Sequence, residues 1–159
     1  MNNLTQNKNY LSPTGFKVSI NSNEFANLEY FCIATSIPAL SLSEVSTPFR
    51  NQQTYTPGDR LDYATFDMRF IVSENMENYS ELYNWIRNNA QEDKWKCADM
   101  ILHILTSSNN PNKRIRYVDA FPKNIGAIEF HTQTSDVEYV TVDASFRYNY
   151  FEFIWSKVG

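Results

Sequence analysis

The chain has 159 residues, of which 42% are apolar and 15% aromatic, so it is long enough to bury a core and is not a disordered tail. Its 14 basic and 18 acidic residues give a net charge of −4, which argues against a protein that grips the phosphates of nucleic acids. The longest apolar run, MILHIL at 100–105, is far shorter than the ~20 residues needed to span a bilayer, so we expect no stable membrane insertion.

The first segment, residues 1–11, is polar and rich in asparagine, and we expect a flexible N-terminal arm. It has neither the apolar region of a signal peptide nor a lipidation signal, which predicts a protein kept in the cytoplasm or packed into a particle assembled there. The SPTG sequence at 12–15 then predicts a turn. Strict alternation over Phe16–Ile20 predicts a strand, and a second, more apolar strand is predicted over Leu28–Ile37, ended by Pro38.

Residues 41–62 form a long polar segment without helical periodicity, interrupted by Pro48 and Pro57. We predict an extended arm here, with a tight turn at Pro57–Asp59. The chain then returns as a regular strand over Tyr63–Val72. The apolar face of that strand would carry Phe66, Met68, Phe70 and Val72. Its outer face would carry Thr65, Asp67, Arg69 and Ile71.

One helix is predicted, over residues 77–89. Asn78 would cap it, with Glu81 three positions later, and the pair Asn88–Asn89 would end it. Tyr79, Leu82, Tyr83 and Ile86 recur at helical spacing beside Trp85, which predicts a core-facing stripe. The exposed face of the helix would carry Glu77, Ser80, Glu81, Asn84 and Arg87.

The last third of the chain is again strand-like. Strands are predicted over Cys97–Thr106, Arg114–Phe121, Ala127–Thr132 and 138–154. In the last of these, Val140, Val142, Ala144, Phe146 and Tyr148 share one face, and Thr141, Asp143, Ser145 and Arg147 share the other. The pattern predicts one antiparallel α+β domain over residues 1–159, mainly β, of sandwich or barrel type, with one inserted helix and a long extended loop.

Nothing in the sequence resembles an active site. His103 lies in an apolar strand and should have a satisfied nitrogen, His131 should lie at the surface, and neither has a nucleophilic partner at a recognisable spacing. Cys32 and Cys97 sit in apolar surroundings and are predicted to be buried, reduced thiols. These four residues lack the paired spacing of zinc sites, so we predict no catalytic residues, no metal and no cofactor.

Two predicted strands share a small, polar, charge-mixed outer face, formed by 65–69 and 141–147. An ordinary solvated face would look the same. The functional alternative is the wall of a water-filled channel along which a polymer passes without sticking. Trp95 and Trp155, flanked by polar or charged residues, are candidates for contact with a partner. Because Tyr and Trp also stack on sugars, a carbohydrate-binding β-domain is a further alternative.

The order of several short motifs resembles the tail tube proteins of contractile-tailed bacteriophages, which are related to the tubes of type VI secretion systems and contractile bacteriocins. The first motif is the step SIPA at 36–39, which follows a strand. The second is the Gly-Asp-Arg sequence at 58–60, which precedes an alternating strand. The third is FPKNIG at 121–126. Each motif alone is weak, but their order and spacing over roughly residues 11–153 carry the resemblance.

The resemblance implies a virion protein that forms hexameric rings, stacked into a hollow tube inside the contractile sheath. Viral DNA would pass through the lumen without specific binding. Segment 41–62 would be the loop that reaches an adjacent ring or subunit, with contact residues Ser46, Thr47, Pro48, Phe49, Arg50, Gly58, Asp59 and Arg60. The polar outer faces would line the lumen, and the exposed helix face would meet the sheath.

The implied partners are other copies of this chain and the sheath, baseplate and terminator proteins of the same tail. An initiator or hub ring on the baseplate, or the terminator ring near the neck, shares the same domain and stays an alternative. The compact chain favours the tube itself. The acidic balance of the chain agrees with a wall that repels DNA.

Overall fold

The structure is a computed structural model that describes residues 11, 13–21, 32–91, 93–106, 108, 111–132 and 139–155. The elements run β1 (Phe16–Ile20), β2 (Cys32–Thr35), β3 (Leu40–Phe49), β4 (Gln52–Tyr63), β5 (Phe66–Ile71), α2 (Glu77–Gln91), β6 (Ala98–Leu105), β7 (Pro111–Ile125), β8 (Thr141–Arg147) and β9 (Tyr150–Trp155). The predicted arm at 1–11 and the first part of the strand predicted from Leu28 fall almost entirely outside these residues.

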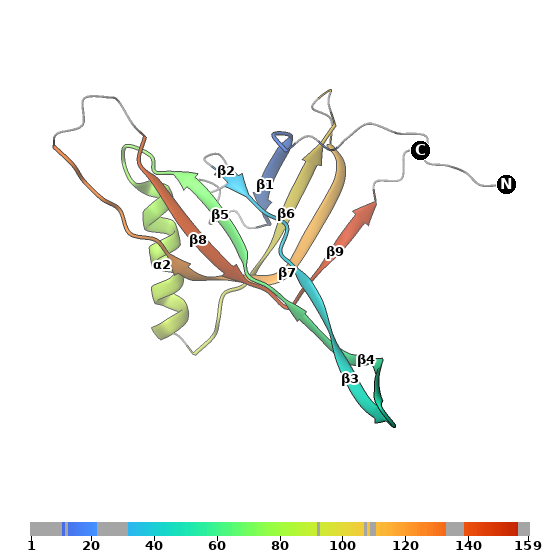
Figure 1. Ribbon diagram of the computed structural model, residues 1–159. Coiled ribbons are helices and arrows are strands. Elements are labelled where there is room, and N and C mark those ends of the chain that lie inside the picture. Colours follow the sequence, from blue (N-terminus) through green and yellow to red (C-terminus); the bar gives the residue numbers. More distant parts are fainter. Residues whose placement is uncertain are drawn as a thin grey trace.

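Seven strands form one antiparallel sheet in the order β1-β6-β7-β8-β5-β2, with β9 also paired to β7. Strand β7 belongs to both halves of this sheet, because its first half pairs with β6 and β9 while Phe121–Ile125 pairs with β8. The sheet therefore folds over on itself as a sandwich (Figure 1). This confirms the mainly antiparallel α+β fold; within one copy it is sandwich-like and does not close as a barrel.

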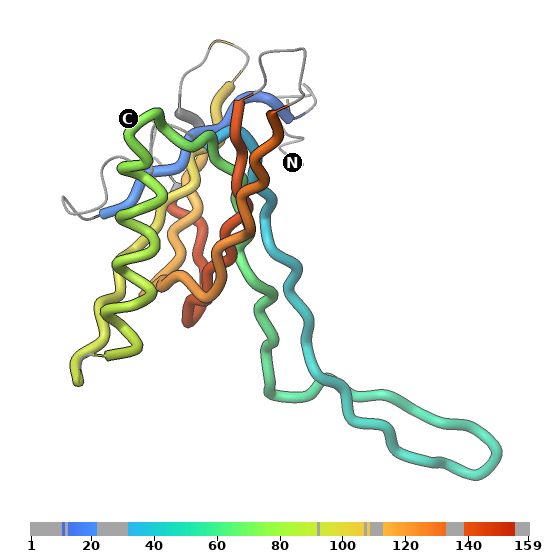
Figure 2. The backbone as a smooth tube through the Cα atoms, turned by 90° about the vertical axis from the view of Figure 1, so that its left-hand side faces the viewer, coloured from blue at the N-terminus to red at the C-terminus, as the bar shows by residue number. Residues whose placement is uncertain are grey.

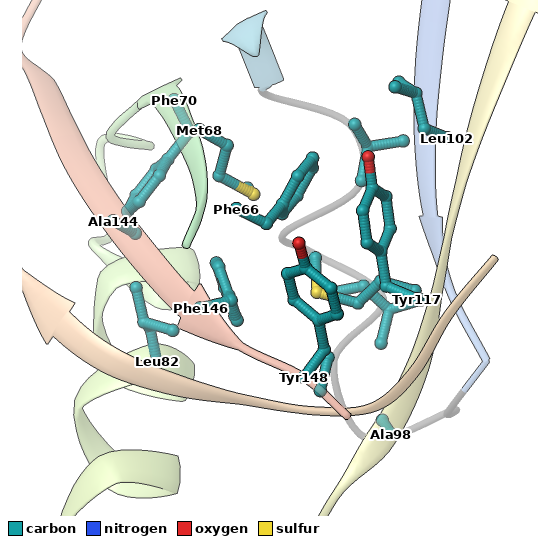
Figure 3. Close-up of a cluster of buried hydrophobic side chains, with 14 of the residues drawn as sticks. Phe66, Met68, Phe70, Leu82, Ala98, Leu102, Tyr117, Ala144, Phe146 and Tyr148 are labelled. Carbon is teal, nitrogen blue, oxygen red and sulfur yellow. The ribbon is translucent and has the colours of Figure 1, made fainter. Parts of the chain in front are cut away.

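The core lies between the two halves of the folded sheet and the helix. Phe66, Met68 and Phe70 of β5 and the inner face of β8 meet side chains of β6 and β7 such as Tyr117 (Figure 3). Phe66 stacks against Tyr117 with ring centroids 4.5 Å apart. The alternation read from the sequence placed most of this apolar face correctly, since Phe66, Met68 and Phe70 and the β8 residues Val142, Ala144 and Phe146 are all buried. Of the other residues predicted for it, Val72 is half-buried and Val140 is exposed.

Helix α2 packs into the core through Leu82 and Trp85. It begins one residue before the predicted cap: Asn78 is fully buried, and the hydroxyl of Ser73 accepts a hydrogen bond from the Glu77 backbone (3.1 Å). Asn78 instead ties the helix to the sheet, because its side-chain amide donates to the carbonyl of Ile71 (2.7 Å). The helix also runs past Asn89, whose side chain pairs with the backbone of Lys96.

Two strand predictions near the end of the chain were wrong. Pro122 does not stop β7, which continues to Ile125 because the proline is buried and pairs with β8, whereas 127–132 is not a strand. The single strand predicted over 138–154 divides at Tyr148–Asn149 into β8 and β9. Tyr148 is buried at this break, and its hydroxyl donates to the carbonyl of Ala64 (2.7 Å).

The largest departure from the sequence prediction is segment 41–62. It is a regular two-stranded hairpin, β3–β4, that projects away from the body on the side opposite α2 (Figures 1 and 2). The chain reverses at Arg50–Asn51, and Pro57–Asp59 lies inside β4 instead of forming the predicted turn. These strands were not predicted because both faces of the hairpin are exposed, so the sequence has only a weak alternation of apolar and polar residues to indicate a strand.

Candidate assembly surfaces

The β3–β4 hairpin exposes apolar side chains on both strands. Leu40, Leu42, Val45 and Phe49 of β3 and Tyr55 and Leu61 of β4 are all at least half exposed. Leu42 lies directly opposite Leu61, so these side chains share a face near the body. An isolated two-stranded hairpin is marginally stable in water, and apolar residues in this arrangement are typical of a surface that another chain covers.

A bulge divides the hairpin into a near and a far half. The register shifts between Leu42 and Glu44, where Ser43 lies opposite 58–60, and the backbone of Arg60 donates to the Ser43 hydroxyl (3.2 Å). Gly58 is required here, because a Cβ would lie 2.3 Å from that hydroxyl oxygen and 2.8 Å from the Ser43 carbonyl oxygen. Bulges bend strands, and the hairpin changes direction about midway along its length (Figure 2).

The tip of the hairpin combines an aromatic ring with a cation. Phe49 is 65% exposed, and the guanidinium carbon of Arg50 lies 5.9 Å from the centre of its ring. Arg50 has a φ of 54°, in the left-handed region that is unfavourable for a residue with a side chain. Asparagine, the residue type at position 51, adopts a positive φ more readily than arginine does. Arg50 therefore holds its backbone conformation at some cost in free energy.

The root of the hairpin is held firmly to the body. Tyr63 makes edge contacts with Tyr148 and Phe151, with ring centroids 6.0 and 5.4 Å apart. The backbone of Ala64 donates to the carbonyl of Ala39 (3.0 Å) and accepts from the Tyr148 hydroxyl. Burial raises the pKa of Tyr148 to about 12, so this hydroxyl keeps its proton at neutral pH. These contacts attach the root of the hairpin to the body.

The polar residues predicted for a channel wall come together on the outer face of β5 and β8. The pairing register places Asp67 opposite Ser145 and Arg69 opposite Asp143. The Ser145 hydroxyl donates to Asp67 (2.7 Å). The Arg69 guanidinium donates twice to the Asp143 carboxylate, at 2.7 and 3.3 Å. A shallow hollow runs over this face, lined by these four residues and by β2.

The charged side chains of this face form hydrogen bonds with neighbouring groups of the protein. A direct hydrogen bond from Arg69 lowers the pKa of Asp143, and the same bond raises the pKa of Arg69. Arg147 donates to the carbonyl of Tyr63 (3.1 Å), which joins the face to the root of the hairpin. Thr141 is exposed and lies opposite Ile71, and Thr65 is half-buried just before β5 begins. The result is a wall that is polar but offers few free cations.

The outer face of α2 mostly matches its prediction. Glu77, Ser80, Asn84 and Arg87 are exposed, while Glu81 is half-buried. Tyr83, predicted to face the core, is 46% exposed and accepts a hydrogen bond from Arg87 (3.4 Å). Trp95, on the segment after the helix, is 80% exposed, as a partner-facing aromatic would be.

Sheet edges are also open. Among the residues that the structure describes, β1, β2 and β9 each pair with a single strand, so one border of each strand has no strand neighbour. Natural proteins usually cover or blunt such borders because they invite pairing with another chain. Within the described part of the chain, these edges are candidates for pairing with strands of other copies.

The residues considered for chemistry are dispersed. His103 bonds to the hydroxyl of Ser19 (3.0 Å), and His131 is exposed beside Glu129. Cys32 is half-buried, and burial raises its thiol pKa to about 11, whereas Cys97 is exposed, which corrects the prediction that it is buried. Within the described ranges, His, Cys, Asp and Glu form no group of three that could hold a metal, and no helix is long and apolar enough to cross a membrane.

Sequence reasoning missed two apolar features. The first is the set of exposed hairpin side chains, for which Leu40, Leu42 and Leu61 were a readable signal. The second is an apolar hollow of about 490 Å³ where β5 ends and β8 begins. It is lined by Ile71, Val72, Ser73, Glu74, Met76, Ile128, Phe130, Tyr139 and Val140. Its residues come from separate parts of the chain, so no local pattern indicates it.

Comparison with known proteins places the chain among tail proteins. A family model described as "Phage tail tube protein" matches residues 2–154. A tail tube protein of Serratia phage KSP90 is 25% identical over 125 residues, which cover 73% of this chain and 69% of that protein.

Two solved structures have a similar fold. One belongs to the PVC extracellular contractile injection system, from its sheath–tube complex in the extended state, with a TM-score of 0.70, 14% identity and 94% of each chain covered. The other is from the PVC sheath/tube terminator in the extended state, with a TM-score of 0.73, 15% identity and coverage of 93% of this chain and 99% of the other. At these identities the likeness establishes the common fold.

Proposed function

This chain belongs to the phage tail tube protein family, whose members are structural parts of the virion tail, and from this premise we propose that it is the repeating subunit of the tube inside a contractile sheath. Copies would close into hexameric rings, and rings would stack into a hollow tube. The observation that carries the proposal is the β3–β4 hairpin, which projects from the body with apolar side chains exposed on both strands.

Ring closure would use the open borders of the sheet. A strand edge of one copy would pair with an edge of its neighbour, so the borders of β1, β2 and β9 would be covered on assembly. Stacking of rings would then bury the hairpin. A contact between two different surfaces of the same chain repeats from copy to copy and grows an open-ended filament, as a tube requires.

The outer face of β5 and β8 would line the lumen. Its two aspartates and two arginines balance in charge, and Arg69 is engaged by Asp143 at 2.7 Å. DNA binding depends on free Lys and Arg that replace counterions on phosphates. A wall whose arginines already have partners would let DNA pass without holding it. The chain would thus act as a conduit without catalysis and without a cofactor.

The outer face of α2 would meet the sheath, since it lies on the side of the body away from the hairpin (Figure 1). Glu77, Ser80, Asn84 and Arg87 give it a mixed, exposed, polar surface. Assembly would take place in the host cytoplasm, with the finished tube carried in the virion. The baseplate and terminator proteins would bind the two ends of the tube.

An end ring of the same tail is the second candidate, because the terminator complex of the PVC system contains a chain of similar fold. Copy number separates the two. A tube subunit must be among the abundant proteins of the particle, whereas an end subunit is present as one ring.

The test is to purify the chain alone and view it by negative-stain microscopy, together with quantitative mass spectrometry of virions. We expect rings or hollow tubes and a copy number close to that of the sheath protein. A chain that stays monomeric at high concentration and is rare in particles would overturn the tube proposal.

A further inference from the structure

The hollow between the end of β5 and the start of β8 lies at the opposite end of the body from the hairpin. Strand β5 runs from the hairpin root to this end, and β8 begins there, as both views show (Figures 1 and 2). The body therefore presents an apolar projection at one end and an apolar hollow at the other. This is the arrangement that a head-to-tail contact between copies needs.

The hollow is exposed and apolar. Phe130 and Tyr139 are 79% and 76% exposed, and Met76 and Val140 are each 36% exposed. Large apolar side chains gathered in this way mark a binding surface more often than an ordinary solvated face. The volume of about 490 Å³ is ample for an aromatic side chain from another molecule.

Charge also matches between the two ends. Among the described residues that line the hollow, Glu74 alone carries a charge. At the hairpin tip, the exposed ring of Phe49 lies beside the guanidinium of Arg50. An aromatic anchor with a neighbouring cation fits an apolar pocket with a carboxylate on its rim.

Backbone strain occurs at the same two places. In the described part of the chain, three residues other than glycine have a positive φ: Arg50 at 54°, Met76 at 55° and Asp119 at 54°. Arg50 is at the hairpin tip, and Met76 lines the hollow. Strained residues persist where the structure or the function fixes them, so the two outliers agree with a role for both positions in one contact.

We propose that the hairpin tip of one copy docks in this hollow of a copy in the next ring, with Phe49 in the apolar space and Arg50 beside Glu74. The inference rests on the proposed stacking of rings and names its receptor surface. Each copy then uses its tip on one neighbour and its hollow on another, so the contact extends along the tube.

A charge exchange tests the pairing. We expect Arg50→Glu and Glu74→Arg each to raise the protein concentration needed for tube formation by about tenfold or more, because each places like charges together. The double variant should recover assembly to within about threefold of the original chain. The matched control exchanges the exposed residues Asp93 and Lys94 on the segment after α2, singly and together, and should leave assembly unchanged. A double variant that assembles no better than its worse parent would overturn the proposal.

A cross-link provides the second measurement and does not depend on a change of charge. With Cys97→Ser as background, Asn51→Cys and Phe130→Cys should give a disulfide between different copies when assembled tubes are oxidised. Cys32 should stay out of the reaction, because its raised pKa of about 11 leaves little thiolate. Tubes that form without the 51–130 link would overturn the docking site while leaving ring stacking intact. Failure of the original chain to form rings or tubes would instead reject the proposed function.

Discussion

A methyl group added at Gly58 should separate assembly from folding. The Cβ of Gly58→Ala would lie 2.3 Å from the Ser43 hydroxyl oxygen and 2.8 Å from the Ser43 carbonyl oxygen. The hydroxyl can rotate away, with loss of its bond from Arg60, but the carbonyl belongs to the backbone and must move by several tenths of an ångström. The two strands therefore have to part at the bulge.

The displacement is small at Gly58 and larger at the tip. Glu44–Phe49 extends roughly 20 Å beyond the bulge at about 3.3 Å per residue, so a change of ~10° in the bend moves the tip by about 3–4 Å. A contact that buries one aromatic side chain does not tolerate such a shift. We expect the concentration needed for tube formation to rise by about tenfold or more, which corresponds to ~1.4 kcal/mol for each contact.

Folding of the body should change little, because the hairpin side chains near Gly58 are exposed and outside the core. We expect the free energy of unfolding to fall by less than ~0.5 kcal/mol. The assay measures assembly by sedimentation and stability by urea denaturation on the same preparations, with Ser41→Ala at the hairpin base as the control. Normal assembly of Gly58→Ala, or a loss of stability that accounts for the loss of assembly, would refute the reasoning.

Four further predictions concern the helix, the polar face and the hairpin. Asn78→Ala should lower the free energy of unfolding by about 1–3 kcal/mol, because the carbonyl of Ile71 loses the donor that the fully buried Asn78 supplies; a change below ~0.5 kcal/mol in urea denaturation would contradict this. Asp143→Asn should free Arg69, so assembled tubes should retain labelled DNA more strongly at low salt, with the gain disappearing as salt rises; unchanged retention would contradict the proposed wall. Because Arg69 lowers the pKa of Asp143, the ion pair contributes above the ordinary aspartate value of 3.8 and is lost as pH falls through the lowered pKa, which NMR titration of the carboxyl can follow. Deletion within Ser46–Tyr55 should abolish stacking and leave the fold intact, and a deletion variant that still polymerises would show that the hairpin has another role.

Much of the fold was readable from the sequence where one face of an element is buried. β1, β5 and β8 were predicted from alternation, because Val18, Met68 and Ala144 face the core while their neighbours face water. The same rule explains the failures. The hairpin strands bury neither face, so the segment gave only weak alternation and was interpreted as an extended arm, without the pairing of Leu40–Phe49 to a second strand. Pro122 was interpreted as the end of a strand, because proline has no backbone N–H to donate. Its pairing with Phe146, which is distant in the sequence, could not be predicted from the local pattern.

The sequence predicted which residues lie on the polar face but not which of them bond to one another. Alternation placed Arg69 and Asp143 on outer faces, yet the bond between them depends on the register of β5 against β8. That register is fixed by contacts between residues 74 positions apart in the sequence. The apolar hollow could not be predicted from the sequence for the same reason, since Met76 and Phe130 come together there only in the folded chain.

The central claim is that single copies are incomplete and that neighbouring copies cover their hairpins and sheet edges by forming a pipe. A helical cryo-electron microscopy reconstruction of the purified, assembled chain tests it most directly. We predict stacked rings in which each hairpin lies on a copy in the next ring and Asp67, Arg69 and Asp143 face an open lumen. A chain found only as separate copies, or an assembly in which the hairpin remains in solvent, would contradict it.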